Sequence, residues 1–127
     1  MLGFKDLIVY QKAYKLAMDI FRMTSNFPKE ERYALTDQIR RSSRSICSNI
    51  SEGYGKRVYP KHFSSKMTDA DGEKNEVMVW LDFCKDCNYI TEEKHGQLMR
   101  GYEEVGRLLW FYIENPEKFN PRNFSNK

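Results

Sequence analysis

Apolar residues recur with a helical period in four segments of the chain, and proline or glycine residues separate these segments. The segments cover residues 7–24, 35–53, 61–87 and 91–116, and residues 29–32 suit one short helical turn before the second segment. No stretch of useful length alternates apolar and polar residues, so we expect no sheet. Helices of this length with short connections predict an all-α fold, an antiparallel up-down-up-down four-helix bundle over residues 1–116. Residues 117–127 are expected to form a loose C-terminal tail.

Each segment predicts a stripe of inward-facing residues. In chain order the four stripes are Leu7, Tyr10, Tyr14, Ala17, Phe21 and Thr24; Leu35, Ile39, Ser42, Ile46, Ile50 and Gly53; Phe63, Met67, Ala70, Val77, Leu81 and Cys84; and Leu98, Tyr102, Val105, Leu109 and Tyr112. Lys74 interrupts the third stripe. Thr91 is a candidate N-cap of the fourth helix, because its hydroxyl can accept a hydrogen bond from a backbone N–H that lacks a partner.

The first helix has more apolar surface than one bundle seam requires. Val9, Ala13, Leu16 and Ile20 widen its apolar arc to about 200°, whereas a seam needs about 100°. In the fourth helix, residues 110 and 111 (tryptophan and phenylalanine) also lie away from the inward stripe. Such surplus apolar surface favours a contact between subunits, and hence a homo-oligomer. Packing of this surface on the C-terminal tail or on the 54–61 loop is the alternative.

Length and composition limit the class of protein. The 127 residues suit one domain with a single core. The apolar runs are far too short to span a membrane, so no membrane partner is expected. Charged residues appear from Lys5 onward, which does not fit a signal peptide and predicts a cytoplasmic protein. The three cysteines, an odd number, fit free thiols in a reducing compartment.

The charges are segregated along the sequence. Residues 40–66 contain seven basic residues and one acidic residue, a net charge of +6, whereas residues 67–104 contain four basic and ten acidic residues, a net charge of −6. Guanidinium groups bind phosphates, and tyrosines such as Tyr54 and Tyr59 can stack on unpaired bases. The candidate binding residues for RNA or single-stranded DNA are therefore Arg40, Arg41, Arg44, Lys56, Arg57 and Lys61. A solvated charged face without a ligand is the alternative.

No motif in the sequence indicates catalysis, a metal or a cofactor. Cys84 and Cys87 form one C-x-x-C inside a predicted helix, whereas zinc needs four ligands and a thioredoxin-like motif needs a helix start. Residues 69–73 lack the glycine and glutamate positions of a calcium loop. The sequence has neither a phosphate-binding nucleotide loop nor a serine-hydrolase motif. We therefore expect a protein that is not an enzyme and has no cofactor.

Residues 38–53 form the most specific motif of the chain. They read Gln38-Ile-Arg-Arg-Ser-Ser-Arg-Ser-Ile-Cys-Ser-Asn-Ile-Ser-Glu-Gly53, which resembles the pattern Q-x-R-R-x-x-x-S-I-x-x-N-I-x-E-G of the 23S rRNA-intervening sequence proteins. The superfamily also includes the accessory variability protein of diversity-generating retroelements. Further matches are residues 4–13, 27–28, 35, 70–72 and 76, so the similarity spans about residues 4–113.

The resemblance implies an antiparallel four-helix bundle, often a ring of five subunits, without known enzymatic activity. For the retroelement members it implies a basic surface that binds nucleic acid and a partner reverse transcriptase. Glu73 is a departure, since the family usually has a serine at this position. The pattern thus favours a non-enzymatic oligomeric scaffold that binds RNA or DNA. The alternative is a protein–protein interaction adaptor in which acidic and basic zones of different chains meet.

The polar residues of the motif have a structural interpretation. Asn49 and Glu52 flank the inward stripe, so we expect a buried hydrogen-bond network with Gln38 or Glu76 that fixes the register of the helices. Ligand binding by the same residues is the alternative. Gly53 is expected to end the second helix in a left-handed conformation.

Overall fold

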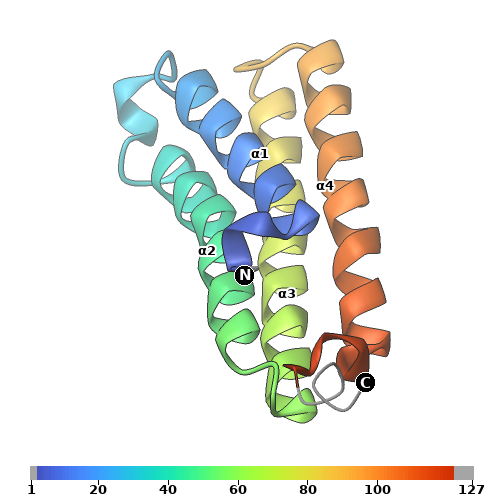
Figure 1. Ribbon diagram of the computed structural model, residues 1–127. Coiled ribbons are helices and arrows are strands. Elements are labelled where there is room, and N and C mark those ends of the chain that lie inside the picture. The colour runs from blue at the N-terminus through green and yellow to red at the C-terminus, as the bar shows by residue number, and fades with distance from the viewer. Residues whose placement is uncertain (1–2, 122–127) are drawn as a thin grey trace.

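The structure is a computed structural model that describes residues 3–121. Within this range it contains helices and no strand. The long helices are α1 (Ile8–Thr24), α2 (Leu35–Gly55), α3 (Pro60–Asp86) and α4 (Glu92–Glu114), and the short 3₁₀ helices are η1 (Phe4–Asp6), η2 (Lys29–Glu31) and η3 (Pro116–Phe119). The long helices run alternately up and down (Figure 1). The predicted antiparallel four-helix bundle is confirmed.

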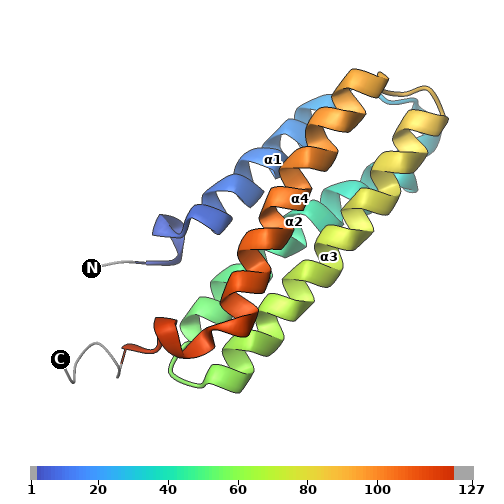
Figure 2. The same cartoon turned by 90° about the vertical axis from the view of Figure 1, so that its right-hand side faces the viewer.

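Each long helix packs on two others, which places the four at the corners of a square. Helix α1 contacts α2 and α4, and α3 contacts the same two helices. Figure 2 shows α4 in front, between α1 and α3, with α2 behind it. Helix α1 has 17 residues and α3 has 27, so α1 covers only part of the length of the bundle. None of the helices within residues 3–121 combines the length and the apolar character that crossing a membrane requires.

The inward stripes predicted for the second, third and fourth helices are confirmed, because every residue of these stripes is buried. Lys74, which interrupts the third stripe, also turns toward α4. Its Nζ atom lies 3.2 Å from Asp71 Oδ1, and a Cβ atom on Gly106 would lie 2.9 Å from Nζ. The Trp110 indole donates a hydrogen bond to Asp71 Oδ2 at 3.2 Å. Glycine at position 106 thus leaves room for a lysine between α3 and α4.

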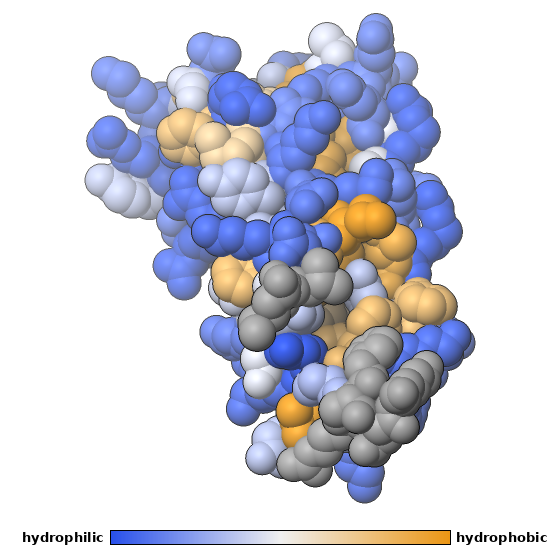
Figure 3. All heavy atoms as spheres, viewed as in Figure 1, coloured by the Kyte–Doolittle hydropathy of each residue, from blue (hydrophilic) through white to orange (hydrophobic). Residues whose placement is uncertain are grey.

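The predicted inward face of α1 is wrong at its aromatic positions. The buried residues of α1 are Val9, Ala13, Ala17, Ile20 and Thr24, whereas Tyr14 is 53% exposed and Phe21 is 38% exposed. An apolar arc of about 200° offers two possible inward faces, and the face with smaller side chains lies against the bundle. Apolar side chains remain visible on the surface where the start of α1 lies beside α4 (Figure 3).

Gly53 does not end α2, so the expectation of a left-handed helix end at this residue is wrong. The helix continues to Gly55, and Gly53 does not have a positive φ. Gly53 is buried because α3 approaches it closely. A Cβ atom at this position would lie 2.7 Å from Met67 Cε and 3.0 Å from Lys66 Cβ. The glycine therefore allows close packing of α2 on α3.

The predicted N-cap of α4 is confirmed, since the Thr91 hydroxyl oxygen accepts a hydrogen bond from the Lys94 N–H at 3.0 Å. The structure differs from the expected loose tail in the first residues of that segment. Residues 116–119 form η3, and the Phe119 ring centroid lies 5.6 Å from that of Phe63 and 4.5 Å from that of Tyr112. These aromatic contacts hold η3 on the bundle, whereas residues 122–127 of the expected tail lie outside the described residues.

Candidate nucleic-acid interface

The six basic residues predicted from the sequence fall into two groups, one in the first half of α2 and one around the turn from α2 to the start of α3. Arg40, Arg41 and Arg44 lie in the first half of α2, and Lys56, Arg57 and Lys61 lie at its end and beyond. Arg44 and Lys56 are twelve residues apart, which corresponds to about 18 Å along a helix. Arg40 and Arg57 are partly buried, and the other four are exposed. We call the six residues the basic face.

Arg40 is bound to the last turn of α1. Its Nε atom donates a hydrogen bond to the Thr24 hydroxyl oxygen at 2.7 Å, and its Nη2 atom donates to the Phe21 carbonyl oxygen at 3.2 Å. The Cζ atom of Arg40 lies 4.6 Å from the centroid of the Phe21 ring, and that of Arg44 lies 5.8 Å from it. Both acceptors of Arg40 are uncharged, so these contacts fix the side chain without neutralising it.

Within residues 3–121, no residue of the basic face forms an ion pair with a carboxylate. Lys66, the seventh basic residue of this part of the chain, is different. Its Nζ atom lies 2.7 Å from Glu52 Oε2 across α2 and α3. The hydrogen bond raises the pKa of Lys66 and lowers the pKa of Glu52. The basic face thus retains its positive charge, whereas the charge of Lys66 is compensated.

The second group of the basic face includes an arginine stacked on a tyrosine. The Cζ atom of Arg57 lies 4.0 Å from the Tyr54 ring centroid, and its Nη1 atom donates to the Tyr54 carbonyl oxygen at 2.9 Å. Tyr59 is 60% exposed, and its ring meets His62 edge-on at 6.1 Å. Of the two tyrosines proposed to stack on bases, Tyr59 therefore presents the more open ring.

A polar hollow of about 320 Å³ lies between the end of α1, η2 and the start of α2. Three of its lining residues are basic and three carry hydroxyl groups, and none is acidic: the lining is Thr24, Ser25, Phe27, Pro28, Lys29, Arg32, Thr36 and Arg40. We call it the η2 hollow. Lys29 and Arg32 are exposed, and two such cations beside each other suit a phosphate group.

Lys29 and Arg32 do not stand out in the sequence as binding residues, because Glu30 and Glu31 lie between them and reduce the local net charge. In the structure Glu31 points elsewhere, since it accepts a hydrogen bond from the Tyr89 hydroxyl at 2.8 Å. This bond raises the pKa of Tyr89 to about 12. The three-residue spacing of Lys29 and Arg32 is the signal that places both on one side of a helical turn.

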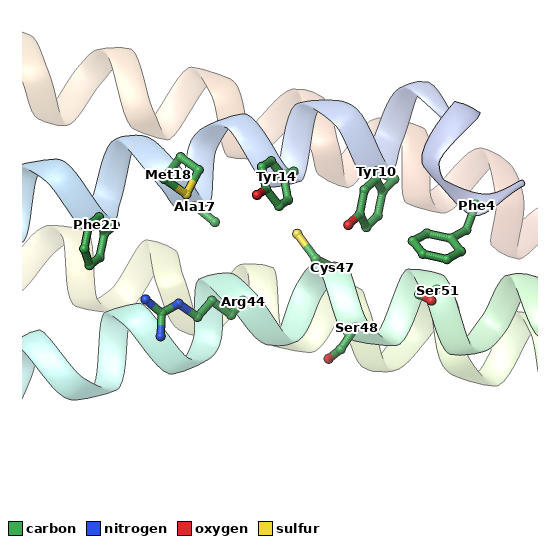
Figure 4. A pocket seen from close by; sticks show the side chains of 10 residues that line it. All are labelled: Phe4, Tyr10, Tyr14, Ala17, Met18, Phe21, Arg44, Cys47, Ser48 and Ser51. Carbon is green, nitrogen blue, oxygen red and sulfur yellow. The ribbon is translucent and has the colours of Figure 1, made fainter.

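An apolar groove of about 450 Å³ lies between α1 and α2. Figure 4 shows the α1 aromatic side chains pointing toward α2, where small side chains form the opposite wall. The groove contains a single charged residue and is lined by Phe4, Tyr10, Tyr14, Ala17, Met18, Phe21, Arg44, Cys47, Ser48 and Ser51. We call it the aromatic groove. Burial raises the pKa of the Cys47 thiol to about 11, so this thiol is a poor nucleophile.

The motif residues form a smaller network than the one expected. The Asn49 amide donates to the Ser45 carbonyl oxygen at 2.9 Å, and a hydrogen bond joins Ser45 to Glu73 of α3. Burial raises the pKa of Glu73, and the nearby Glu76 carboxylate raises it further. Glu76 also accepts a hydrogen bond from the Trp80 indole at 3.3 Å.

Two of the expected members lie outside this network. Glu52 pairs with Lys66, and Gln38 is exposed beside an apolar hollow next to Trp80 and Phe83. The C-x-x-C residues differ in environment, since Cys84 is buried with its pKa raised to about 12 and Cys87 is exposed. In the described part of the chain, no three His, Cys, Asp or Glu side chains are grouped to hold a metal ion.

Comparison with known proteins identifies relatives of the sequence and of the fold. The profile of a family described as 23S rRNA-intervening sequence protein matches residues 5–110. A solved structure of a protein of unknown function from the S23 ribosomal protein family of Bacteroides thetaiotaomicron VPI-5482 is 28% identical in sequence, with a TM-score of 0.77. The match covers 87% of this chain and 99% of that one. Among curated proteins there is no match.

Proposed function

We propose, from the premise that the chain belongs to the 23S rRNA-intervening sequence protein family, that it is a non-enzymatic oligomeric scaffold that binds RNA or DNA. The basic face is the proposed contact surface. The observation that carries the proposal is that its six cationic side chains have no carboxylate partner within residues 3–121. Uncompensated cations attract a polyanion, and arginine binds phosphate oxygens in a bidentate manner.

The outer surface of α3 supports the oligomeric part of the proposal. Gly72 lies in the middle of a 27-residue helix with open space around it, although glycine at such a position destabilises a helix by about 1 kcal/mol relative to alanine. Val79 and Phe83, on the same side of α3, are 49% and 53% exposed. A neighbouring subunit that packs closely on this surface would account for both features.

Repetition of the basic face in an oligomer would strengthen weak contacts. Each subunit contributes separate phosphate contacts, and linked contacts raise the overall affinity without new chemistry. A ring, which the family resemblance implies, would present the face once per subunit around a common axis. Light scattering tests this part, and a mass equal to one chain would exclude the oligomeric scaffold.

Binding to a labelled single-stranded RNA at low salt tests the nucleic-acid part. Arg41→Ala/Arg44→Ala removes two exposed cations and is expected to weaken binding roughly tenfold. Arg40 is left intact because it also binds α1. Arg100→Ala/Arg107→Ala removes two exposed arginines from α4 instead and should leave the affinity nearly unchanged. Equal losses in the two double variants would show that net charge, and not the basic face, determines binding.

A protein–protein interaction adaptor is the second candidate. Residues 67–104 have a net charge of −6 and residues 40–66 a net charge of +6, so unlike zones of two chains can attract each other. This function predicts a protein that assembles normally and shifts no nucleic acid in a gel at low salt. The same result would contradict the nucleic-acid proposal.

A further inference from the structure

We infer that the surface between α1 and α2 binds a single strand, with an unpaired base in the aromatic groove and an adjoining phosphate in the η2 hollow. The inference rests on the proposed function and makes it more specific. It names an unpaired strand, in place of a duplex, as the ligand. It also adds Lys29, Arg32 and the aromatic residues of α1 to the contact surface.

The hollow and the groove share no lining residue, but Arg40 of the hollow contacts Phe21 of the groove. Arg40 lines the η2 hollow, and Arg44 and Phe21 line the aromatic groove. The guanidinium groups of Arg40 and Arg44 lie 4.6 and 5.8 Å from the Phe21 ring centroid. A region rich in cations and hydroxyl groups therefore adjoins an apolar region lined by rings. A nucleotide matches both regions. Its anionic phosphate suits the cationic region, and its flat base stacks on aromatic rings.

Tyr14 has the most open ring among the groove residues. The groove aromatics other than Tyr14 are partly covered by neighbours, since Phe4 meets Tyr10 edge-on at 5.1 Å and Arg40 lies over Phe21. Tyr14 is 53% exposed and lies 6.0 Å from the Tyr10 ring. From Tyr10 to Phe21 the helix extends about 16 Å, so the groove has room for at least one base beside Tyr14.

The small residues of α2 make this space available. In Figure 4, Cys47 points toward the α1 side chains, whereas the Ser48 hydroxyl points away from them. Larger side chains here would fill the space between the helices. The Ser51 hydroxyl group, which lines the groove, can hydrogen-bond to the polar edge of a base.

The combined lining distinguishes a single strand from other occupants. An acyl chain or an apolar peptide would fill the groove but would leave the exposed cations of the η2 hollow, Lys29 and Arg32, without an anionic partner. A duplex offers phosphates, but its bases are paired and stacked and cannot enter a groove between two helices. No lining residue of either region is acidic, which suits a polyanion.

The test compares three labelled probes with the full chain at one salt concentration: a 12-nucleotide single-stranded RNA, a duplex of the same length, and an abasic strand with the same number of phosphates. We expect the single strand to bind roughly tenfold more tightly than the abasic strand. Tyr14→Ala should abolish this difference without changing the affinity for the abasic strand. Tyr14→Phe, which retains the ring, should preserve it.

Two further variants separate the regions. Lys29→Gln/Arg32→Gln should weaken binding of every probe, the abasic strand included, because it removes phosphate contacts. Arg100→Ala/Arg107→Ala removes two exposed arginines of α4 that line neither region, and it should change nothing. A change in oligomer mass with Tyr14→Ala would identify the groove as a subunit contact and overturn the inference.

The outcomes also separate the inference from the proposed function. Equal binding of the single strand and the abasic strand would overturn the base site while leaving the phosphate-binding face intact. Failure of every probe to bind would contradict the proposed function itself. Binding of adenosine monophosphate as tightly as the 12-mer would indicate a mononucleotide site and overturn the single-strand ligand.

Discussion

Arg40 of α2 donates a hydrogen bond from Nε to the hydroxyl oxygen of Thr24, the last residue of α1, at 2.7 Å. The same guanidinium donates to the Phe21 carbonyl oxygen, in the turn where helix carbonyls lack partners from the helix backbone. Arg40 thus caps the last turn of α1 by hydrogen bonding. It retains its positive charge because both acceptors are neutral. One residue of the basic face therefore has a structural role as well as the proposed binding role.

We predict that Arg40→Lys lowers stability but retains most of the nucleic-acid affinity. Lysine keeps the charge and loses the planar fork that reaches both Thr24 and Phe21. The expected loss in the free energy of unfolding is about 1–2 kcal/mol, measured by urea denaturation. An unchanged free energy of unfolding would show that the contacts with α1 do not stabilise the fold.

The difference in stability between Gly53→Ala and Gly72→Ala measures the close packing of α2 on α3. Both substitutions gain the same helix propensity, about 1 kcal/mol. Within one chain, only the Cβ atom at position 53 meets neighbours, at 2.7 Å from Met67 Cε and 3.0 Å from Lys66 Cβ, so the two variants are compared under conditions in which light scattering gives both the same mass. Gly53→Ala should therefore be less stable than Gly72→Ala by about 1–3 kcal/mol. Equal thermal midpoints in the two variants would contradict the close approach.

Glu73→Gln should stabilise the protein at pH 7. Burial and then Glu76 raise the pKa of Glu73 in the folded state, so the folded state binds more protons than the unfolded state. Its stability therefore falls as the pH rises from the usual glutamate pKa through the raised value. Glutamine removes this penalty, which is a few tenths of a kcal/mol for the like-charge pair. The gain should disappear when denaturation is repeated near pH 4.

Glu52→Gln provides a control of opposite sign for the same experiment. The hydrogen bond with Lys66 lowers the pKa of Glu52, so its contribution to stability is present above the usual glutamate pKa. That contribution is lost as the pH falls through the lowered value. Glu52→Gln should therefore be less stable than the unmodified chain at pH 7. A gain in stability from both glutamine variants would contradict the assignment of the two carboxylates.

The three thiols should react with Ellman's reagent at pH 8 in two phases. Cys87 is exposed, whereas burial raises the pKa of Cys47 to about 11 and that of Cys84 to about 12. The thiolate is the reactive form, so Cys87 should account for one fast equivalent. Cys87→Ser should remove the fast phase alone. A fast equivalent that persists in this variant would show that Cys47 or Cys84 is accessible.

The sequence was sufficient to predict the bundle and three of its four inward stripes, because in α2, α3 and α4 the longest regular run of apolar positions is the one that is buried. It was insufficient for α1, where two apolar faces compete and only packing against α4 decides between them. Leu16 illustrates this, since a Cβ atom on Gly101 would lie 2.7 Å from Leu16 Cδ2. Gly53 was misinterpreted for a related reason, because a close approach of α3 has no local signal in the sequence.

The candidate site was predictable only in part. The basic face is predictable, because its six cations lie within 22 consecutive residues that contain one acidic residue. The η2 hollow forms only when the α1–α2 connection lies beside Arg40. Its cations Lys29 and Arg32 are not apparent from the local net charge, because Glu30 and Glu31 cancel it. The aromatic groove depends on the choice of inward face for α1, which the sequence left open.

The salt dependence of binding to a single-stranded RNA tests the central claim, that the basic face binds nucleic acid, most directly. If six phosphates are contacted, the logarithm of the binding constant should fall with the logarithm of the salt concentration with a slope of roughly −4, and roughly −3 for Arg41→Ala/Arg44→Ala. Arg100→Ala/Arg107→Ala should retain the slope of the unmodified protein. Binding that ignores salt, or one slope shared by all three proteins, would contradict the claim.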